Sequence, residues 1–228
     1  MKKLGIGLLV MIFVMNFGSC TTEELVVPQE NLLKSYKLKK DAEGHYSIEY
    51  NVADKTSATI QKDFNSLTNE IYLTENNQAT KKNYITDFSL ENDNKLRVGF
   101  IDENSGRKPM ITVDDENITF GRGIESTTLL KTYSVESNGD GTVQLDFEVN
   151  NGVNVWFVYN DELEIYEVHL KRGYQIGTNF SRTISFGERG ILKIDFVNHL
   201  NAHGRSTADA EYIEKKPRLI LNEEGGNS

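Results

Sequence analysis

The stretch SYKLKKDAEGHYSIEYNV, residues 35–52, recurs without a gap as TYSVESNGDGTVQLDFEV, residues 132–149. Apolar and polar residues alternate in both stretches, and the alternating positions coincide when the two are aligned. This alternation is typical of a β-strand with one buried face. In the second stretch, Asn138 to Gly141 separates two such runs, and Asn and Gly tolerate the positive φ that tight hairpin turns require. The sequence therefore predicts the same β-hairpin twice.

The similarity extends to the C-terminal end of the chain, which indicates an internal duplication. The further aligned pairs are NEIYL (69–73) with YEVHL (166–170), KLRVGFID (95–102) with LKIDFVN (192–198), and KPMITVDD (108–115) with KPRLILNE (216–223). The number of residues that separates aligned positions of the two copies increases chiefly before the last pair. The second copy therefore carries a loop insertion at about residues 199–213.

Each copy is expected to contain about seven strands. The spacing of Ile60, Phe64, Leu67 and Ile71 alone would favour a helix, but the aligned segment at 153–159 is rich in the Val, Tyr, Phe and Trp that favour strands. We therefore expect two strands here in both copies. For the second copy the expected strands are 131–136, 142–149, 153–159, 163–170, 180–186, 190–197 and 217–222.

This pattern predicts an all-β protein of two tandem immunoglobulin-like β-sandwich domains, with a single closed barrel as the alternative. We call residues 33–120 repeat 1 and residues 129–224 repeat 2, and we expect a linker at 121–128.

The N-terminus has the pattern of a secretory signal at residues 1–19. Two lysines precede an apolar run from Leu4 to Val14, and the small residues Gly18 and Ser19 follow. The apolar run is shorter than the roughly 18 residues that a membrane-spanning helix needs. We therefore expect cleavage, which would leave residues 20–32 as a tether.

Cys20 follows the small residues directly, and this arrangement resembles the lipobox of bacterial lipoproteins, although Phe17 stands where that motif usually carries Leu. Glu23 and Glu24 then resemble the acidic stretch that can direct lipoproteins of Bacteroidota to the cell surface. The resemblance covers about the first 25 residues. It implies that Cys20 is acylated and that the lipid attaches the protein to the outer membrane.

Composition excludes several classes of function. The formal net charge is -9, and an acidic surface repels phosphate backbones, so nucleic acid is not an expected partner. Cys20 is the only cysteine, which rules out an intramolecular disulfide and a metal site built from several cysteines. No GxSxG, HExxH or phosphate-binding glycine motif is present, so the sequence predicts no catalytic residues, no metal and no cofactor.

The insertion in repeat 2 is the first candidate for a binding site. It contains His199, His203 and Arg205 and has no counterpart in repeat 1. Loops at the end of a β-sandwich commonly carry binding residues. In a helical turn the two histidines, four residues apart, would point the same way, but we interpret them as ligand contacts in preference to metal ligands.

Trp156 is the second candidate, because it lies on the outward phase of its strand, where repeat 1 has Thr59. Such a side chain can stack on a sugar ring or pack against the other repeat. Glu167 and His169 also fall on an outward phase, and we interpret them as ordinary surface residues. The leading hypothesis is a binding protein for a glycan, peptide or protein partner. The alternatives are a surface hydrolase of polysaccharide or protein, and a structural subunit of a cell-envelope assembly.

Overall fold

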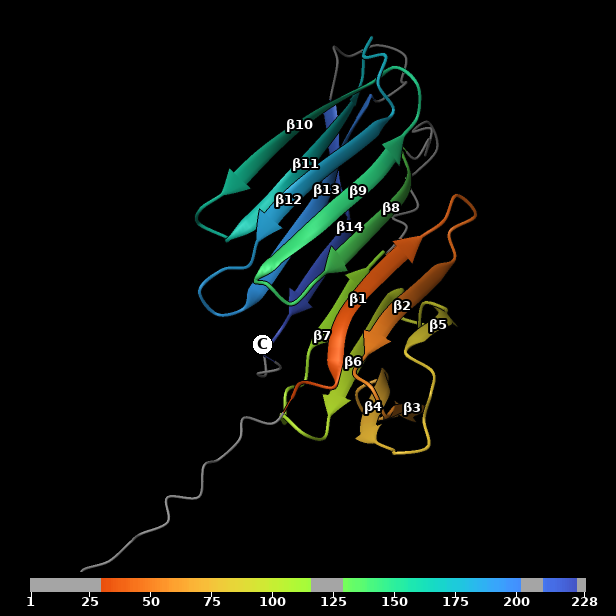
Figure 1. Ribbon diagram of the computed structural model, residues 1–228. Helices are drawn as coiled ribbons and strands as arrows, with labels where there is room; N and C mark the ends of the chain where they lie inside the picture. The colour runs from red at the N-terminus through yellow and green to blue at the C-terminus, as the bar shows by residue number, and fades with distance from the viewer. Residues whose placement is uncertain (1–29, 116–128, 202–210, 225–228) are drawn as a thin grey trace, which may run out of the picture.

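The computed structural model describes residues 30–115, 129–201 and 211–224, and these residues form an all-β protein of 14 strands (Figure 1). None of them forms a helix long and apolar enough to cross a membrane. Repeat 1 contributes β1 (Leu33–Lys40), β2 (Tyr46–Val52), β3 (Thr56–Asp63), β4 (Thr68–Glu75), β5 (Asn83–Phe88), β6 (Lys95–Asp102) and β7 (Met110–Asp114). Repeat 2 contributes β8 (Leu130–Ser137), β9 (Thr142–Val149), β10 (Val153–Asn160), β11 (Ile165–Arg172), β12 (Asn179–Ser185), β13 (Ile191–Asn201) and β14 (Glu211–Asn222).

The strands form two sheets, and each sheet contains strands of both repeats. The six-stranded sheet has the order β12-β9-β8-β1-β2-β5, and the eight-stranded sheet has the order β10-β11-β13-β14-β7-β6-β4-β3. The inward side chains of both sheets form one hydrophobic core cluster. Within it, the ring of Phe196 on β13 contacts those of Tyr133 on β8 and Phe147 on β9, at centroid distances of 5.5 and 5.6 Å.

The repeats meet at two antiparallel strand pairs, one in each sheet. β1 pairs with β8, where Leu38 lies opposite Val135, and β7 pairs with β14, where Thr112 lies opposite Ile220. The sequence alignment also equates Leu38 with Val135 and Thr112 with Ile220. When an antiparallel strand pair is centred on two equivalent residues, exchanging the two strands leaves the pairing of residues unchanged. A pseudo-two-fold axis therefore passes through both junctions and relates repeat 1 to repeat 2.

The prediction of two separate tandem sandwiches is wrong, because both sheets run through both repeats. The predicted strands are nevertheless present, including β3 and β4 in the segment with helical spacing. The hairpin turn between β8 and β9 has Gly139 and Gly141 at φ values of 74° and 83°. Alternation of apolar residues identified the buried face of each strand, but it carries no information about which strand lies along each edge.

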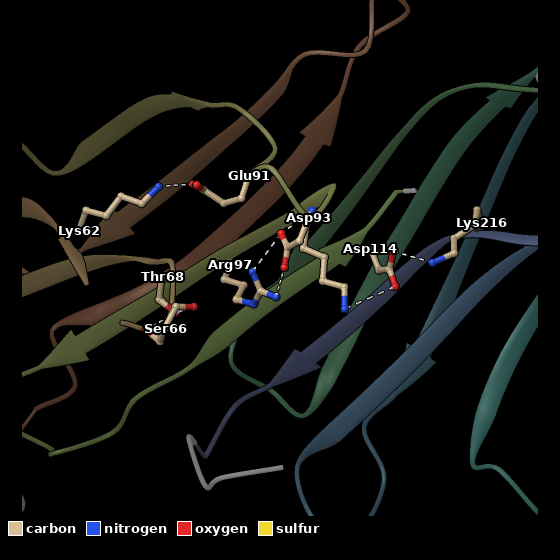
Figure 2. Close-up of polar contacts among 9 residues, drawn as sticks. Lys62, Ser66, Thr68, Glu91, Asp93, Arg97, Asp114 and Lys216 are labelled. Carbon is tan, nitrogen blue, oxygen red and sulfur yellow. Dashed lines mark hydrogen bonds and ion pairs between the residues drawn. The ribbon is translucent and has the colours of Figure 1, made fainter. Parts of the chain in front are cut away.

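Charged side chains also join the repeats on the outer surface. Figure 2 shows Asp114 of β7 facing Lys216 of β14. The Lys216 ammonium lies 2.5 Å from the Asp114 carboxylate, and the Lys95 ammonium lies 4.0 Å from it. The Lys216 contact therefore crosses from repeat 2 to repeat 1.

The folded part begins slightly earlier than predicted. Leu32, assigned above to the tether, is only 2 % exposed, and its backbone N–H donates a 2.7 Å hydrogen bond to the Asp102 carboxylate. The signal segment, Cys20 and the linker at 121–128 lie outside the described residues.

The insertion in repeat 2 is partly strand. β13 and β14 are longer than their equivalents β6 and β7, and His199 pairs with Ile213 in the ladder that ends at Asn201 opposite Glu211. The loop prediction is therefore wrong for both flanks of the insertion. A helical turn that includes His199 is also excluded, and His203 and Arg205 lie outside the described residues.

Candidate functional site

Several polar and aromatic side chains gather on the outer face of the eight-stranded sheet in repeat 2. Trp156 on β10 lies opposite His169 on β11, and the parallel pairing of β11 with β13 places Lys171 opposite His199. Successive side chains of a strand alternate between faces, so Trp156, His169 and His199 project from the same side. Together with Glu167 and Lys215 they form a group that we call the aromatic–histidine cluster.

Three rings of the cluster contact one another. The ring centroids of Trp156 and His169 are 5.0 Å apart with an interplanar angle of 14°, which is a stacked pair. His199 lies 5.0 Å from Trp156 and 5.1 Å from His169. Trp156 is 38 % exposed, so its indole remains accessible from solvent. The outward orientation that the sequence predicted for Trp156 is confirmed.

Four side chains of the cluster are linked in series by polar contacts. His199 Nε2 lies 2.8 Å from His169 Nδ1, His169 Nε2 lies 3.1 Å from a Glu167 oxygen, and the Lys215 ammonium lies 2.6 Å from the other Glu167 oxygen. A carboxylate only accepts hydrogen bonds, so this network assigns the proton of His169 to Nε2. Nδ1 of His169 then accepts, and His199 Nε2–H donates to it.

Burial and neighbouring charges set the protonation states of His169 and Glu167. Burial lowers the pKa of His169, because the imidazolium loses hydration, and the opposing effect of the Glu167 carboxylate does not restore it. Burial alone would raise the pKa of Glu167, but the Lys215 ammonium and His169 outweigh it and hold that pKa below its ordinary value. At neutral pH we therefore expect neutral His169 between His199 and an ionised Glu167.

An ion pair lies beside the cluster. The Arg218 guanidinium donates two hydrogen bonds of 2.7 Å to the two oxygens of Asp195, which faces Glu167 across the β11–β13 pair. Asp195 is 0 % exposed and its neighbour Val197 is 1 % exposed, although both fall on the outward phase of β13. Side chains of this outer face therefore cover one another here, and Glu167 is itself only 6 % exposed.

Repeat 1 shows what the same strands look like without the cluster. The residues equivalent to Trp156, Glu167, His169, Asp195 and Arg218 are Thr59, Glu70, Tyr72, Gly99 and Met110. There the Tyr72 hydroxyl donates a 2.5 Å hydrogen bond to Glu70. The strands form equally well with these residues, so the fold itself does not require the cluster.

The structure brings together two of the four predicted binding residues, Trp156 and His199. Glu167 and His169 were interpreted as ordinary surface residues, but both belong to the cluster. The available signal was their position two residues apart on the outward phase, beside the strand that carries an outward tryptophan. Within the described residues, no group of three or more side chains is arranged to hold a metal ion.

Comparisons with protein-family models, curated proteins and solved structures gave no match for this chain. Its function has to be inferred from its own chemistry.

Proposed function

We propose that the protein is a lipid-anchored binding protein of the bacterial outer membrane, and that it recognises a glycan at the aromatic–histidine cluster. The observation that carries this proposal is the accessible indole of Trp156, stacked on His169. A pyranose ring has an apolar C–H face that packs on an aromatic ring, while its hydroxyl groups bond with polar side chains nearby. Imidazole, carboxylate and ammonium groups all lie within the cluster.

The cluster is also held in place before any ligand arrives. His169 is fixed by hydrogen bonds on both ring nitrogens, and Glu167 is fixed by Lys215. A binding group that is already immobilised loses less side-chain entropy on association. This supports a recognition role for Trp156 over a role in packing alone.

The experiment uses the fact that the chain has one tryptophan. The fluorescence of Trp156 in the full chain should change and saturate when a neutral soluble polysaccharide from a panel of laminarin, xylan and galactomannan is added. Trp156→Ala should be retarded less than the unmodified chain by the same polysaccharide in affinity electrophoresis, and Thr59→Ala at the equivalent position of repeat 1 is the matched control. Absence of a response to the whole panel, or equal retardation of Trp156→Ala, would reject the glycan proposal.

His203 and Arg205 stay predictions, because they lie outside the described residues. If they contact the same ligand as Trp156, His203→Ala and Arg205→Ala should each weaken the binding measured by Trp156 fluorescence. Unchanged affinity in both variants would confine the site to the cluster.

The anchor is tested separately. Cys20→Ser should abolish incorporation of labelled palmitate and should move the protein from the detergent phase to the aqueous phase on Triton X-114 partitioning. A variant that stays in the detergent phase would contradict lipidation at Cys20.

A hydrolase is the second candidate, favoured by the contact between Glu167 and His169. A carboxylate that orients an imidazole is an arrangement used in general base catalysis. Release of reducing sugar from the bound polysaccharide, lost in Glu167→Gln and retained in Glu70→Gln, would replace the binding proposal with an enzymatic one.

A further inference from the structure

A cavity lies on the outer face of the six-stranded sheet. This sheet packs against the eight-stranded sheet that carries the aromatic–histidine cluster (Figure 1). The volume of the cavity is about 590 Å³. All six strands contribute outward residues to its lining, and the strand registers place one from each strand in a single row across the sheet. In order, the row is Ser181, Asp146, Ser134, Lys39, Ser47 and Asp87. With strands about 4.8 Å apart, the groove extends roughly 24 Å across both repeats.

The pseudo-two-fold axis relates this row to a neighbouring row on the same face. The neighbouring row is Ile85, Glu49, Lys37, Glu136, Gln144 and Thr183. Where the groove has Ser134, Ser47 and Ser181, the related row has the longer side chains Lys37, Gln144 and Ile85. The cavity at the related position has a volume of only about 230 Å³, and Lys37 and Ile85 are among the residues that line it.

The same fold therefore accepts long side chains at these positions. The groove is wider where Ser134 and Ser181 replace Lys37 and Ile85, which line the smaller cavity. Folding alone does not explain why this half of the face carries serine. A difference of this kind between two copies of one scaffold indicates a role in binding.

The groups that line the groove determine which class of ligand it can bind. Lys39 pairs with Glu49, and the Lys37 ammonium lies 2.8 Å from Glu136, so the charge of both lysines is compensated. Asp146 accepts a 2.5 Å hydrogen bond from the Ser181 hydroxyl. The Thr132 hydroxyl and the Asn179 amide, which both donate and accept, also line the groove. The remaining lining consists of aromatic rings and charged side chains: Tyr46, Tyr133, Phe147, Phe180, Lys40, Asp41, His45 and Glu148.

We infer that this groove binds a neutral oligosaccharide in extended form, at a site separate from the aromatic–histidine cluster. An anionic ligand would meet Asp146 and Asp87, and an apolar ligand would offer no hydrogen-bond partner to the hydroxyls of Ser47 and Ser134. A chain of sugar hydroxyls matches groups that both donate and accept. The inference rests on the groove and on the comparison between repeats, and it stands whether or not Trp156 binds a glycan.

The test is isothermal titration calorimetry of the full chain with neutral tetrasaccharides: cellotetraose, laminaritetraose, maltotetraose, mannotetraose and xylotetraose. Ser134→Lys and Ser47→Gln introduce the residues that the related row already carries, so they fill the groove without a change that the fold cannot hold. Each should weaken binding of the tetrasaccharide at least tenfold. Ser185→Lys and Ser185→Gln, on the exposed end of β12 outside the groove, are the matched controls and should bind normally.

One further measurement distinguishes binding in the groove from binding at the aromatic–histidine cluster. Trp156→Ala should retain the heat of binding in the groove, and Ser134→Lys should retain any fluorescence response of Trp156. Loss of all heat in Trp156→Ala would mean that the cluster is the only glycan site and would overturn the inference. Normal affinity of Ser134→Lys, no heat with any tetrasaccharide, or binding of an extended Ser-Gly peptide in their place would overturn it as well.

Discussion

At the scale of single residues, the contact between His169 and His199 depends on one proton. The two facing nitrogens are 2.8 Å apart, so one must donate and the other must accept. If His169 gains a second proton, both of its ring nitrogens become donors, and the contact persists only if His199 changes tautomer and accepts at Nε2. Trp156 stacks on His169, so it should sense this event directly.

We therefore expect the fluorescence of Trp156 to change as pH falls, with a midpoint below 6.5, the ordinary pKa of histidine, because burial lowers the pKa of His169. Glu167→Gln removes the charge that favours the imidazolium and should move the midpoint lower. Glu70→Gln, the equivalent change in repeat 1, should leave it unchanged. A midpoint above 6.5, or no shift in Glu167→Gln, would contradict the assigned network.

Protonation of His169 should also change the stability of the folded protein. The unfolded chain protonates His169 near 6.5, whereas the folded chain does so at lower pH, so stability is full above 6.5 and is lost as pH falls toward the folded pKa. His169→Tyr supplies the residue that repeat 1 carries as Tyr72 and should flatten the dependence of Tm on pH in this window. Equal slopes for His169→Tyr and the unmodified chain would refute the prediction.

At the scale of elements, β13 and β14 depend on the ion pair between Asp195 and Arg218. Arg218→Ala would leave the Asp195 carboxylate buried without a partner, and we expect a loss of roughly 3 kcal/mol in the free energy of unfolding. The double variant Asp195→Gly with Arg218→Met supplies the residues of repeat 1 at both positions and should recover much of that loss. Urea denaturation measures both, and a double variant no more stable than Arg218→Ala would show that the unpaired charge is not the cause.

The sequence predicts where the strands lie, but it does not predict which strands lie beside one another. Alternation located all seven strands of repeat 2, because each strand buries one face in the core. It misjudged Glu167, whose outward phase suggested solvent although only 6 % of the residue is exposed. The covering side chains come from β13 and β14, including Lys215. No local pattern encodes that proximity, since it depends on the order of strands in the sheet.

Strand order also explains why the separate sandwiches did not appear. Leu38 and Val135 looked like the core residues of two independent domains, and they are core residues of one. Their strands form the junction in the six-stranded sheet, so each repeat covers an edge that the other would leave open. An alignment of the repeats gives their equivalence but not the contact between them.

At the scale of the whole molecule, both candidate sites lie where the two repeats differ. The aromatic–histidine cluster replaces Thr59 and Tyr72, and the groove replaces Lys37 and Ile85 with serines. A symmetric scaffold has thus become asymmetric on both faces while its junctions stay symmetric. If both proposed sites bind glycan, one molecule can hold two segments of polysaccharide, and simultaneous binding raises avidity beyond that of either site.

The symmetric junctions predict how the halves behave when they are separated. A fragment of residues 30–120 would expose the edges of β1 and β7, and a second copy of the fragment can cover both, with Leu38 opposite Leu38 and Thr112 opposite Thr112. We therefore expect this fragment to be a homodimer or unfolded, and to form a one-to-one complex when it is refolded with residues 121–228.

Light scattering after size-exclusion chromatography gives the masses of these species. Leu38→Asp places a charge at the centre of the junction, where the leucine is 0 % exposed, and should prevent both assemblies. The equivalent pair in the intact chain is held by covalent connection, so the same substitution there should lower stability with no change in mass. A monomeric fragment of residues 30–120 that unfolds cooperatively would show that repeat 1 is an independent domain, because only a self-sufficient core can fold without the partner strands of repeat 2.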